Sequence, residues 1–146
     1  MKPLILIILI PLLFSCAKSN YVSTEDLKRQ FDEINSDCSL KFQNDELCLS
    51  MEWEIFPTED TFGRFVMKFY KIDHPEITIE PNNAPNVLLW MPSMGHGSSP
   101  VTLTTLSPGT YLVSDVFFNM LGTWDIRFQL KNGNDVIEQQ ILKITI

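Results

Sequence analysis

Two methionines and a histidine, Met91, Met94 and His96, lie close together in the stretch WMPSMGHG. Thioether sulfur is a soft, polarizable donor, and together with imidazole it suits Cu(I) better than it suits hard cations such as Mg²⁺. Gly95 and Gly97 flank the histidine and let the backbone bend into φ and ψ values that other residues avoid. The spacing therefore predicts a turn that holds copper, with Met94 and His96 as principal ligands and Met91 as a helper.

A third sulfur is available from Met120, in the short connection NMLG further along the chain. We expect Met120 to join the metal ligands if the two turns meet at one end of the fold. Trp90 and Trp124 border the two segments. An indole face beside a Cu(I) thioether site would shield the ion from water and from oxidation, so these tryptophans are expected to border the site.

An architectural role for the same residues is the alternative. Methionine fills irregular gaps in cores and packs against aromatic rings, and Met91 continues an apolar segment. Met120 shares its alternation phase with Val116 and Phe118, which favours a core position over a ligand position. The ring of His96 would then bond a backbone carbonyl. In this interpretation the domain is a structural or protein-interaction module of an envelope complex.

Sequence motifs for catalysis are missing. No glycine-rich phosphate loop, HExxH helix or nucleophile elbow appears in the sequence. His96 lies near Ser98, but nothing marks the orienting group or the oxyanion hole that a hydrolase needs. The net charge of −7 at pH 7 disfavours nucleic acid as a partner, because that partner needs clustered Lys and Arg. We therefore expect a binding module and not an enzyme.

The N-terminus has the form of a bacterial signal peptide over residues 1–15. Its apolar run, from Leu4 to Phe14, is shorter than the about 20 residues that a membrane-spanning helix needs. The run ends in Leu-Phe-Ser-Cys, which resembles a lipobox, in which Cys16 receives lipid such as palmitate and becomes the new N-terminus. That resemblance implies a lipoprotein whose first partner is a membrane. The following residue is Ala17 and not Asp, which by the enterobacterial sorting pattern favours the periplasmic side of the outer membrane over the inner membrane.

Two further cysteines, Cys38 and Cys48, remain as an even pair in an oxidising compartment, which predicts a disulfide. Closing a loop of this size stabilises a fold by about 3 kcal/mol in the chain-entropy model. A dithiol metal or redox site is the alternative, although the spacing is unlike CxxC. Cys38 belongs to residues 16–46, which we expect to form a tether with a short amphipathic helix capped by Ser23 or Thr24, and Cys48 follows them.

Residues 47–146 have the two-residue period of β-strands, beginning with the alternation from Leu47 to Ile55. Turn signals separate the later strands, and KNGND predicts a hairpin with Asn132 and Gly133 at its centre. The pattern predicts an all-β, immunoglobulin-like β-sandwich of about seven strands, with a small barrel as second choice.

One strand changes phase partway along its length. Tyr111 and Val113 have one alternation phase, whereas Val116 has the other. A bulge near Ser114 and Asp115 would let both sets face the core. We therefore expect an irregularity in the pairing of this strand.

The motifs together resemble the YtkA-like domain, a family of small bacterial envelope domains related to the FixH-like proteins. That family's pattern runs from an apolar strand into Met-Pro-x-Met-Gly-His, then Gly-x-Tyr, then Phe-x-Met-x-Gly-x-Trp. The matching positions here are Met91, Pro92, Met94, Gly95, His96, Gly109, Tyr111, Phe118, Met120, Gly122 and Trp124. The resemblance covers residues 50–146 and implies an all-β fold and an envelope location, without bringing any catalytic residue. The combined expectation is a membrane-anchored periplasmic lipoprotein that binds Cu(I) and passes it to an envelope protein.

Overall fold

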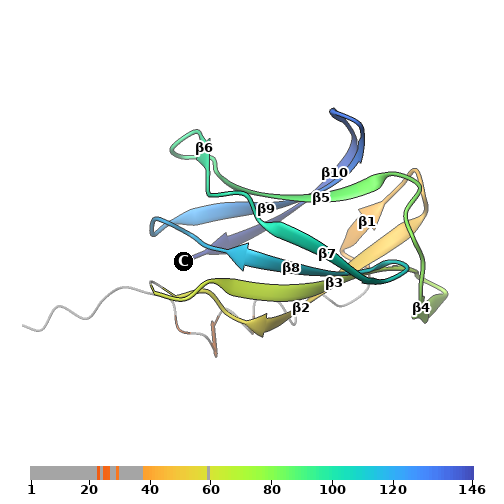
Figure 1. The fold of residues 1–146 in the computed structure, drawn as a ribbon, viewed down its shortest axis with the longest axis horizontal. Coiled ribbons are helices and arrows are strands. Elements are labelled where there is room, and N and C mark those ends of the chain that lie inside the picture. Colours follow the sequence, from red (N-terminus) through yellow and green to blue (C-terminus); the bar gives the residue numbers. More distant parts are fainter. Residues whose placement is uncertain (1–22, 24, 27–28, 30–37, 59) are drawn as a thin grey trace, which may run out of the picture.

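Two antiparallel β-sheets pack face to face (Figure 1). The computed structural model describes residues 23, 25–26, 29, 38–58 and 60–146. Sheet A contains β1 (Leu40–Phe42), β2 (Leu47–Ile55), β3 (Gly63–Lys71), β4 (His74–Thr78), β7 (Thr102–Ser107) and β8 (Thr110–Val116). Sheet B contains β5 (Ala84–Met91), β6 (His96–Gly97), β9 (Thr123–Asn132) and β10 (Asp135–Thr145). The prediction of an all-β sandwich is confirmed.

Hydrogen-bonded pairing sets the order of the strands. Sheet A runs β1-β2-β3-β8-β7, with β4 paired to β3, and sheet B runs β10-β9-β5-β6. The structure has more strands than the expected seven because β1, β4 and β6 are short segments without a clear alternation in the sequence. Their pairing depends on the neighbouring strand and not on their own pattern.

Alternation along the long strands separates the core from the surface. In β2, Leu49 and Met51 are buried, whereas Glu52 and Glu54 further along the strand are exposed. The side chains that fill the space between the sheets are mostly aromatic or branched. The largest fully buried ones are Trp124, Phe42, Phe65, Phe69, Phe128, Leu47, Met51, Met67, Leu89, Ile126 and Leu130.

The predicted bulge in β8 is confirmed. Against β3, the pairing passes from Phe65 opposite Val113 to Gly63 opposite Val116, so an extra residue is accommodated on β8. Asp115 takes the left-handed conformation, with φ of 60°, which occurs in the G1 class of bulges. As a result Val113 and Val116 are both fully buried although they differ in phase.

The hairpin between β9 and β10 is confirmed with its centre one residue later than expected. Asn132 pairs with Asp135, so the central residues are Gly133 and Asn134. Gly133 has φ of 60°, and glycine at the first central position is typical of a type II′ turn. Asn132 is therefore the last residue of β9 and not part of the turn.

The sandwich begins earlier in the chain than the boundary expected at residue 47. Leu40 and Phe42 of β1 are buried in the core, 5% and 0% exposed. Immediately before β1, Cys38 forms a disulfide with Cys48, and their Cα atoms are 5.1 Å apart. The predicted pairing of these cysteines is thus present, and it ties the start of the sandwich to β2.

Most of the preceding segment lies outside the described residues, including the expected signal peptide, Cys16 and most of the expected helix. In the described part, Ser23 Oγ accepts a hydrogen bond of 3.2 Å from the backbone N–H of Asp26, as a helix N-cap does. No helix in the described part of the chain is long and apolar enough to cross a membrane.

Candidate functional site

The two segments that carry the predicted ligands lie at the same end of the sandwich (Figure 1). The β5–β6 turn comprises residues 92–95, and the β8–β9 connection comprises residues 117–122. The side-chain hydroxyl of Ser98, just after β6, donates a hydrogen bond to the backbone carbonyl of Phe117. We call the region formed by these two segments the loop end.

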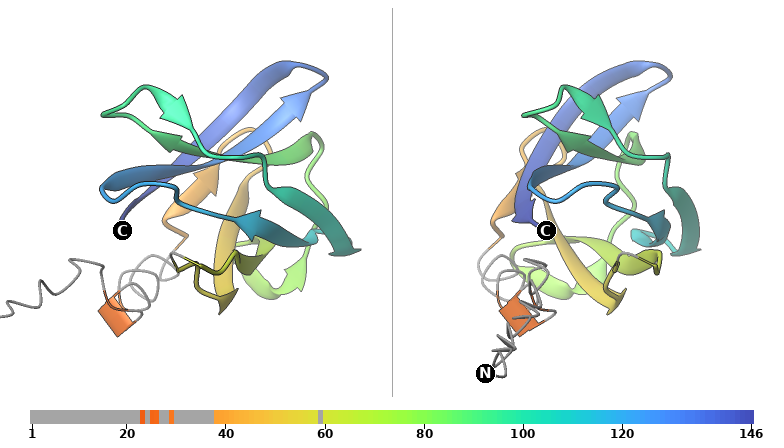
Figure 2. Two further views of the ribbon diagram at one scale, coloured as in Figure 1. Left: turned by 60° about the vertical axis from the view of Figure 1, so that its left-hand side comes forward. Right: turned by 90° about the vertical axis from the view of Figure 1, so that its left-hand side faces the viewer.

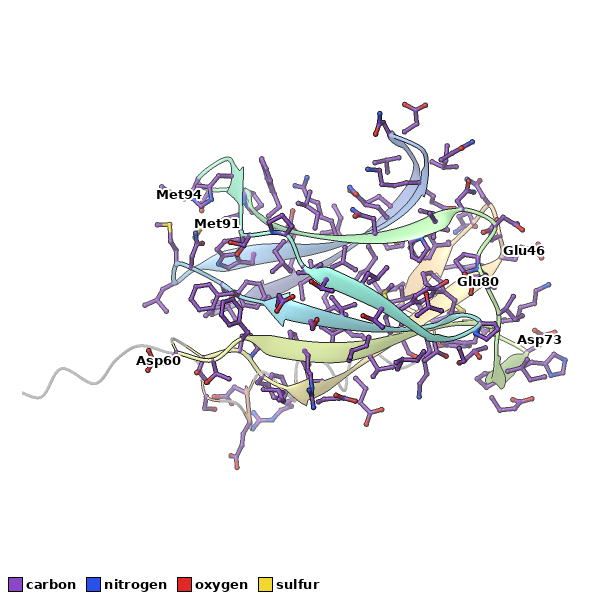
Figure 3. All side chains as sticks on the ribbon, viewed as in Figure 1. Glu46, Asp60, Asp73, Glu80, Met91 and Met94 are labelled. Atoms are coloured by element: carbon purple, nitrogen blue, oxygen red, sulfur yellow. A yellow bond between two sulfur atoms is a disulfide. The ribbon has the colours of Figure 1, made fainter. Side chains whose placement is uncertain are left out.

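Met94 projects from the tip of a tight turn. The backbone N–H groups of Met94 and Gly95 both donate to the carbonyl of Met91, at 3.2 and 3.0 Å. Gly95 has φ of 68°, which closes the turn so that Met91 pairs with His96. The Met94 side chain is 55% exposed and lies at the outer edge of the molecule in Figure 3. Its thioether is therefore accessible from solvent.

Met91 has a different environment from Met94. Its side chain is 5% exposed and belongs to the hydrophobic core. The terminal methyl group lies 2.6 Å from the position that a β-carbon on Gly122 would occupy, so the two segments touch there. Met91 therefore joins the two halves of the loop end by packing, in agreement with the architectural interpretation of this residue.

Met120 lies on the surface, and the core position favoured by its alternation phase is wrong. Its side chain is 40% exposed. The reason is that β8 ends at Val116, so the two-residue period no longer applies in the connection that follows. The backbone carbonyl of Met120 accepts a hydrogen bond of 3.0 Å from Nε1 of Trp124, which fixes the connection while leaving the thioether free of the core.

The imidazole of His96 is half-buried and held in one orientation. Its Nδ1 lies 3.1 Å from the carbonyl oxygen of Gly97. Because a carbonyl oxygen only accepts, Nδ1 must carry the proton, and the lone pair of the neutral ring is then on Nε2. The ring also contacts Trp124 in an edge-to-face arrangement, with centroids 6.3 Å apart. A histidine in this tautomer has a nitrogen ready for a metal.

The two tryptophans do not border the site in the same way. Trp124 faces the core, fully buried, beside the imidazole of His96. Trp90 pairs in register with Asp125, the residue after Trp124, and therefore points to the opposite face of sheet B. The expectation that both indoles border the site is correct for Trp124 alone.

Trp90 belongs to a cluster that the sequence did not reveal. The guanidinium of Arg127 lies 5.2 Å from the centre of the Trp90 ring, a cation–π geometry. Arg127 also pairs with the carboxylate of Asp125 at 3.1 Å, and Asp125 is 4% exposed. Trp90, Asp125 and Arg127 therefore lie together on the outer face of sheet B. The only indication of this cluster in the sequence is that Asp125 and Arg127 are two residues apart on one strand and so share a face.

Tyr111, another position of the motif, has a structural role. Its phenol donates a hydrogen bond to the carboxylate of Glu80, which also accepts from the backbone N–H of Gly109 at 2.7 Å. Burial raises the pKa of Tyr111 well above its ordinary value, and the hydrogen bond to Glu80 and its negative charge raise it further. Figure 3 places Glu80 at the end of the sandwich opposite Met94, so this cluster is remote from the loop end.

Harder donors do not gather in the described part of the chain. There, no group of three or more His, Cys, Asp or Glu side chains is arranged to hold a metal ion. The second histidine, His74, is exposed at the start of β4, between the carboxylates of Asp73 and Glu76 at 3.8 and 3.5 Å. His74 is thus a surface residue of β4 and not part of the loop end.

Comparisons with family models, curated proteins and solved structures find no match to this chain.

Proposed function

We propose that this protein is a lipid-anchored envelope lipoprotein with a YtkA-like sandwich that binds Cu(I) at the loop end. Met94, Met120 and His96 would be the ligands. The observation that carries the proposal is the exposure of two thioethers in the two connections of the loop end, together with a histidine that follows the first connection in the chain and has one ring nitrogen already satisfied. Soft sulfur and neutral imidazole are the donors that Cu(I) prefers.

The distribution of methionines supports a functional reason for the exposed pair. The methionines of the long strands, Met51, Met67 and Met91, are 1%, 1% and 5% exposed. Met94 and Met120 are the two exposed methionines in the described part of the chain, and both lie in the loop end. Methionine packs well in cores, so its exposure at one end of the fold favours a role for the sulfur itself.

The environment of His96 supports the same proposal. Metal-ligating histidines almost always donate the other ring N–H to a carbonyl or carboxylate, which fixes the tautomer and the ring orientation. The hydrogen bond from Nδ1 to the Gly97 carbonyl has this form. Packing against the buried ring of Trp124 restrains the imidazole further. A ligand held in place in this way loses little conformational entropy when it binds an ion.

The proposed location at a membrane is compatible with transfer of copper to another protein. A lipid on Cys16 would hold the domain at the periplasmic side of a membrane, with residues before the sandwich as tether. Copper reaches this compartment from outside the cell, and solvent-exposed ligands would let a second envelope protein receive the ion. Transfer of the ion to such a protein is therefore the activity that we propose, and no covalent chemistry is required of this chain.

Competition for Cu(I) tests the proposal. The purified protein is mixed with the Cu(I) complex of bicinchoninate under ascorbate and without oxygen, and the loss of chelator absorbance is measured. We expect the parent to withdraw one equivalent of copper. Met94→Leu combined with His96→Ala should weaken binding by about tenfold or more, since even the loss of an outer-shell partner has an effect of that size.

Matched variants separate ligand loss from other effects. Met→Leu removes the sulfur but nearly conserves side-chain volume. His74→Ala removes the other histidine, which is exposed at the start of β4, the strand that Figure 1 shows at the end of the sandwich opposite β6, and should leave copper affinity unchanged. Equal affinity of the parent and of the Met94→Leu, His96→Ala double variant would contradict the proposal.

An interaction module is the second candidate, and exposed apolar residues at the same end favour it. Phe62, at the end of the β2–β3 connection, is 58% exposed and its ring lies 5.2 Å from that of Phe117. Leu121 in the β8–β9 connection is 52% exposed. This function requires no copper, so the titration above distinguishes it from the first proposal.

A further inference from the structure

One long segment of the chain is uncharged. Between Glu80 and Asp115 the chain has no Asp, Glu, Lys or Arg, although 20% of all residues are charged. This segment forms β5, β6, β7 and most of β8. In sheet B, β6 is the last strand and lies next to β5; in sheet A, β7 is the last strand and lies next to β8. The net charge of −7 is therefore carried by the rest of the molecule.

β7 is the outermost strand at one end of sheet A. Among the described residues it pairs with β8 alone, and the right-hand view of Figure 2 shows it at the margin of the sheet. All of its residues except Leu103 are exposed. An edge strand presents a row of backbone N–H and C=O groups without strand partners, which is a template for pairing with another strand.

In the orders β1-β2-β3-β8-β7 and β10-β9-β5-β6, the other terminal strands are β1, β6 and β10, and they are protected in ways that β7 is not. Proteins guard edge strands with charged side chains or by keeping the strands very short. β10 carries Asp135, Glu138 and Lys143. β1 has three residues and β6 has two. β7 contains only Thr, Leu and Ser over six residues, and its one register shift lies between Thr105 and Ser107, leaving the first four residues regular.

We propose that β7 pairs antiparallel with β7 of a second copy of this chain, so that sheet A continues through a two-fold dimer. A two-fold contact brings the same surface of both copies together, so any charge at its centre meets a like charge. β7 has no such charge. The nearest carboxylate, that of Asp115, accepts a hydrogen bond from the Thr102 hydroxyl at the start of the strand. Repulsion between two acidic molecules opposes the other approaches.

Thr104 provides a probe of this contact that does not disturb the core. In the pairing with β8, Leu103 and Thr105 lie opposite the buried residues Val113 and Tyr111. Thr104 lies opposite Leu112 and therefore points to the outer face of sheet A. It is near the middle of β7, so the two copies of Thr104 would lie close together across the two-fold axis.

The oligomeric state of the full chain, purified in dodecyl maltoside, tests the proposal. Light scattering with correction for detergent should give twice the protein mass of one chain. Thr104→Lys and Thr104→Glu should each give a monomer, because each places like charges together. An equimolar mixture of the two variants should restore the dimer, which also shows that both variants are folded. Thr145→Lys, on the edge strand β10, is the control and should remain dimeric.

Three outcomes would overturn the proposal. The first is a monomeric parent at every concentration measured. The second is a dimer that persists in Thr104→Lys or is lost equally in the Thr145→Lys control. The third is an equimolar mixture of Thr104→Lys and Thr104→Glu that stays monomeric. Copper takes no part in the contact, so this result and the copper titration are independent.

Discussion

The terminal methyl group of Met91 packs against Gly122, 2.6 Å from the position where a β-carbon would lie. Gly122 has φ of 135°, a conformation that residues with a β-carbon rarely adopt. The contact joins the end of β5 to the β8–β9 connection. It therefore holds together the two segments that carry the exposed methionines, and it gives a structural reason for a methionine and a glycine at these positions.

Gly122→Ala should lower the free energy of unfolding by about 1–3 kcal/mol, chiefly because φ of 135° strains a residue with a β-carbon; the Met91 methyl is the end of a flexible side chain and can shift. Gly95→Ala is the control, because Gly95 also has positive φ, 68°, but no heavy atom lies within 4 Å of its β-carbon position. Urea denaturation measures both. If Gly122→Ala destabilises no more than Gly95→Ala, the backbone at φ of 135° is no more strained by a β-carbon than the backbone at φ of 68°, and the prediction is wrong.

The methionines should separate into two classes when each is replaced by alanine. Met91→Ala should cost about 2–5 kcal/mol in unfolding free energy, because it leaves a cavity in the core. Met94→Ala and Met120→Ala should change it by about 0.5 kcal/mol or less, as at other exposed positions. Thermal or urea unfolding measures all three. A loss for Met120→Ala as large as that for Met91→Ala would mean that Met120 is a core residue after all.

Alkaline pH should destabilise the protein through Tyr111. The folded state raises the pKa of this phenol, so it holds the proton more tightly than the unfolded chain does. The stabilisation is therefore fully present below about pH 10, the ordinary tyrosine pKa, and is lost as the pH rises above it. Unfolding free energy measured between pH 8 and pH 11 should fall less steeply in Tyr111→Phe than in the parent.

The neutral-pH effect of the same variant is a second readout. Tyr111→Phe removes the hydrogen bond to the Glu80 carboxylate and should cost about 1.5 kcal/mol. Tyr70 has a pKa that burial also raises, and it remains in both proteins, so it contributes equally to their alkaline loss. Parallel pH profiles for the parent and Tyr111→Phe would contradict the assignment of the effect to Tyr111.

The disulfide should contribute about 3 kcal/mol to stability, since it closes a loop with a sequence separation of 10. The double variant Cys38→Ser, Cys48→Ser should unfold at a correspondingly lower urea concentration. Mass spectrometry after alkylation without reductant should find both cysteines unmodified in the parent. Alkylation of either thiol in the folded, unreduced protein would show that the bond does not form.

Alternation predicted the long strands because their pattern is local. β2 has the same bounds as the predicted strand, Leu47 to Ile55, and the phase change in β8 located the bulge at Ser114 and Asp115. β1 and β4 could not be found in this way. β1 has three residues, and the residues of β4 are exposed apart from a half-buried Thr78, so neither has a period to detect. Such strands form because a neighbour offers backbone partners.

The candidate site was predictable as a set of residue types, and less so as a geometry. The turn after β5 and its approach to the β8–β9 connection follow from Met91, Gly95 and Gly122. The exposure of Met120 could not be predicted from the sequence. Met120 has the same alternation phase as Val116, but β8 ends at Val116 and the alternation does not extend to Met120. The hydrogen bond that fixes the His96 tautomer is also invisible in sequence, since it depends on where one carbonyl of the turn points.

X-ray absorption at the copper edge, on protein loaded with one equivalent of Cu(I), identifies the ligands of the proposed copper site. We expect a first shell of mixed sulfur and nitrogen, from the thioethers of Met94 and Met120 and the imidazole of His96. Met120→Leu should remove one sulfur and leave the nitrogen. A shell without sulfur, or a sulfur signal unchanged in both Met94→Leu and Met120→Leu, would show that copper is not bound by these residues.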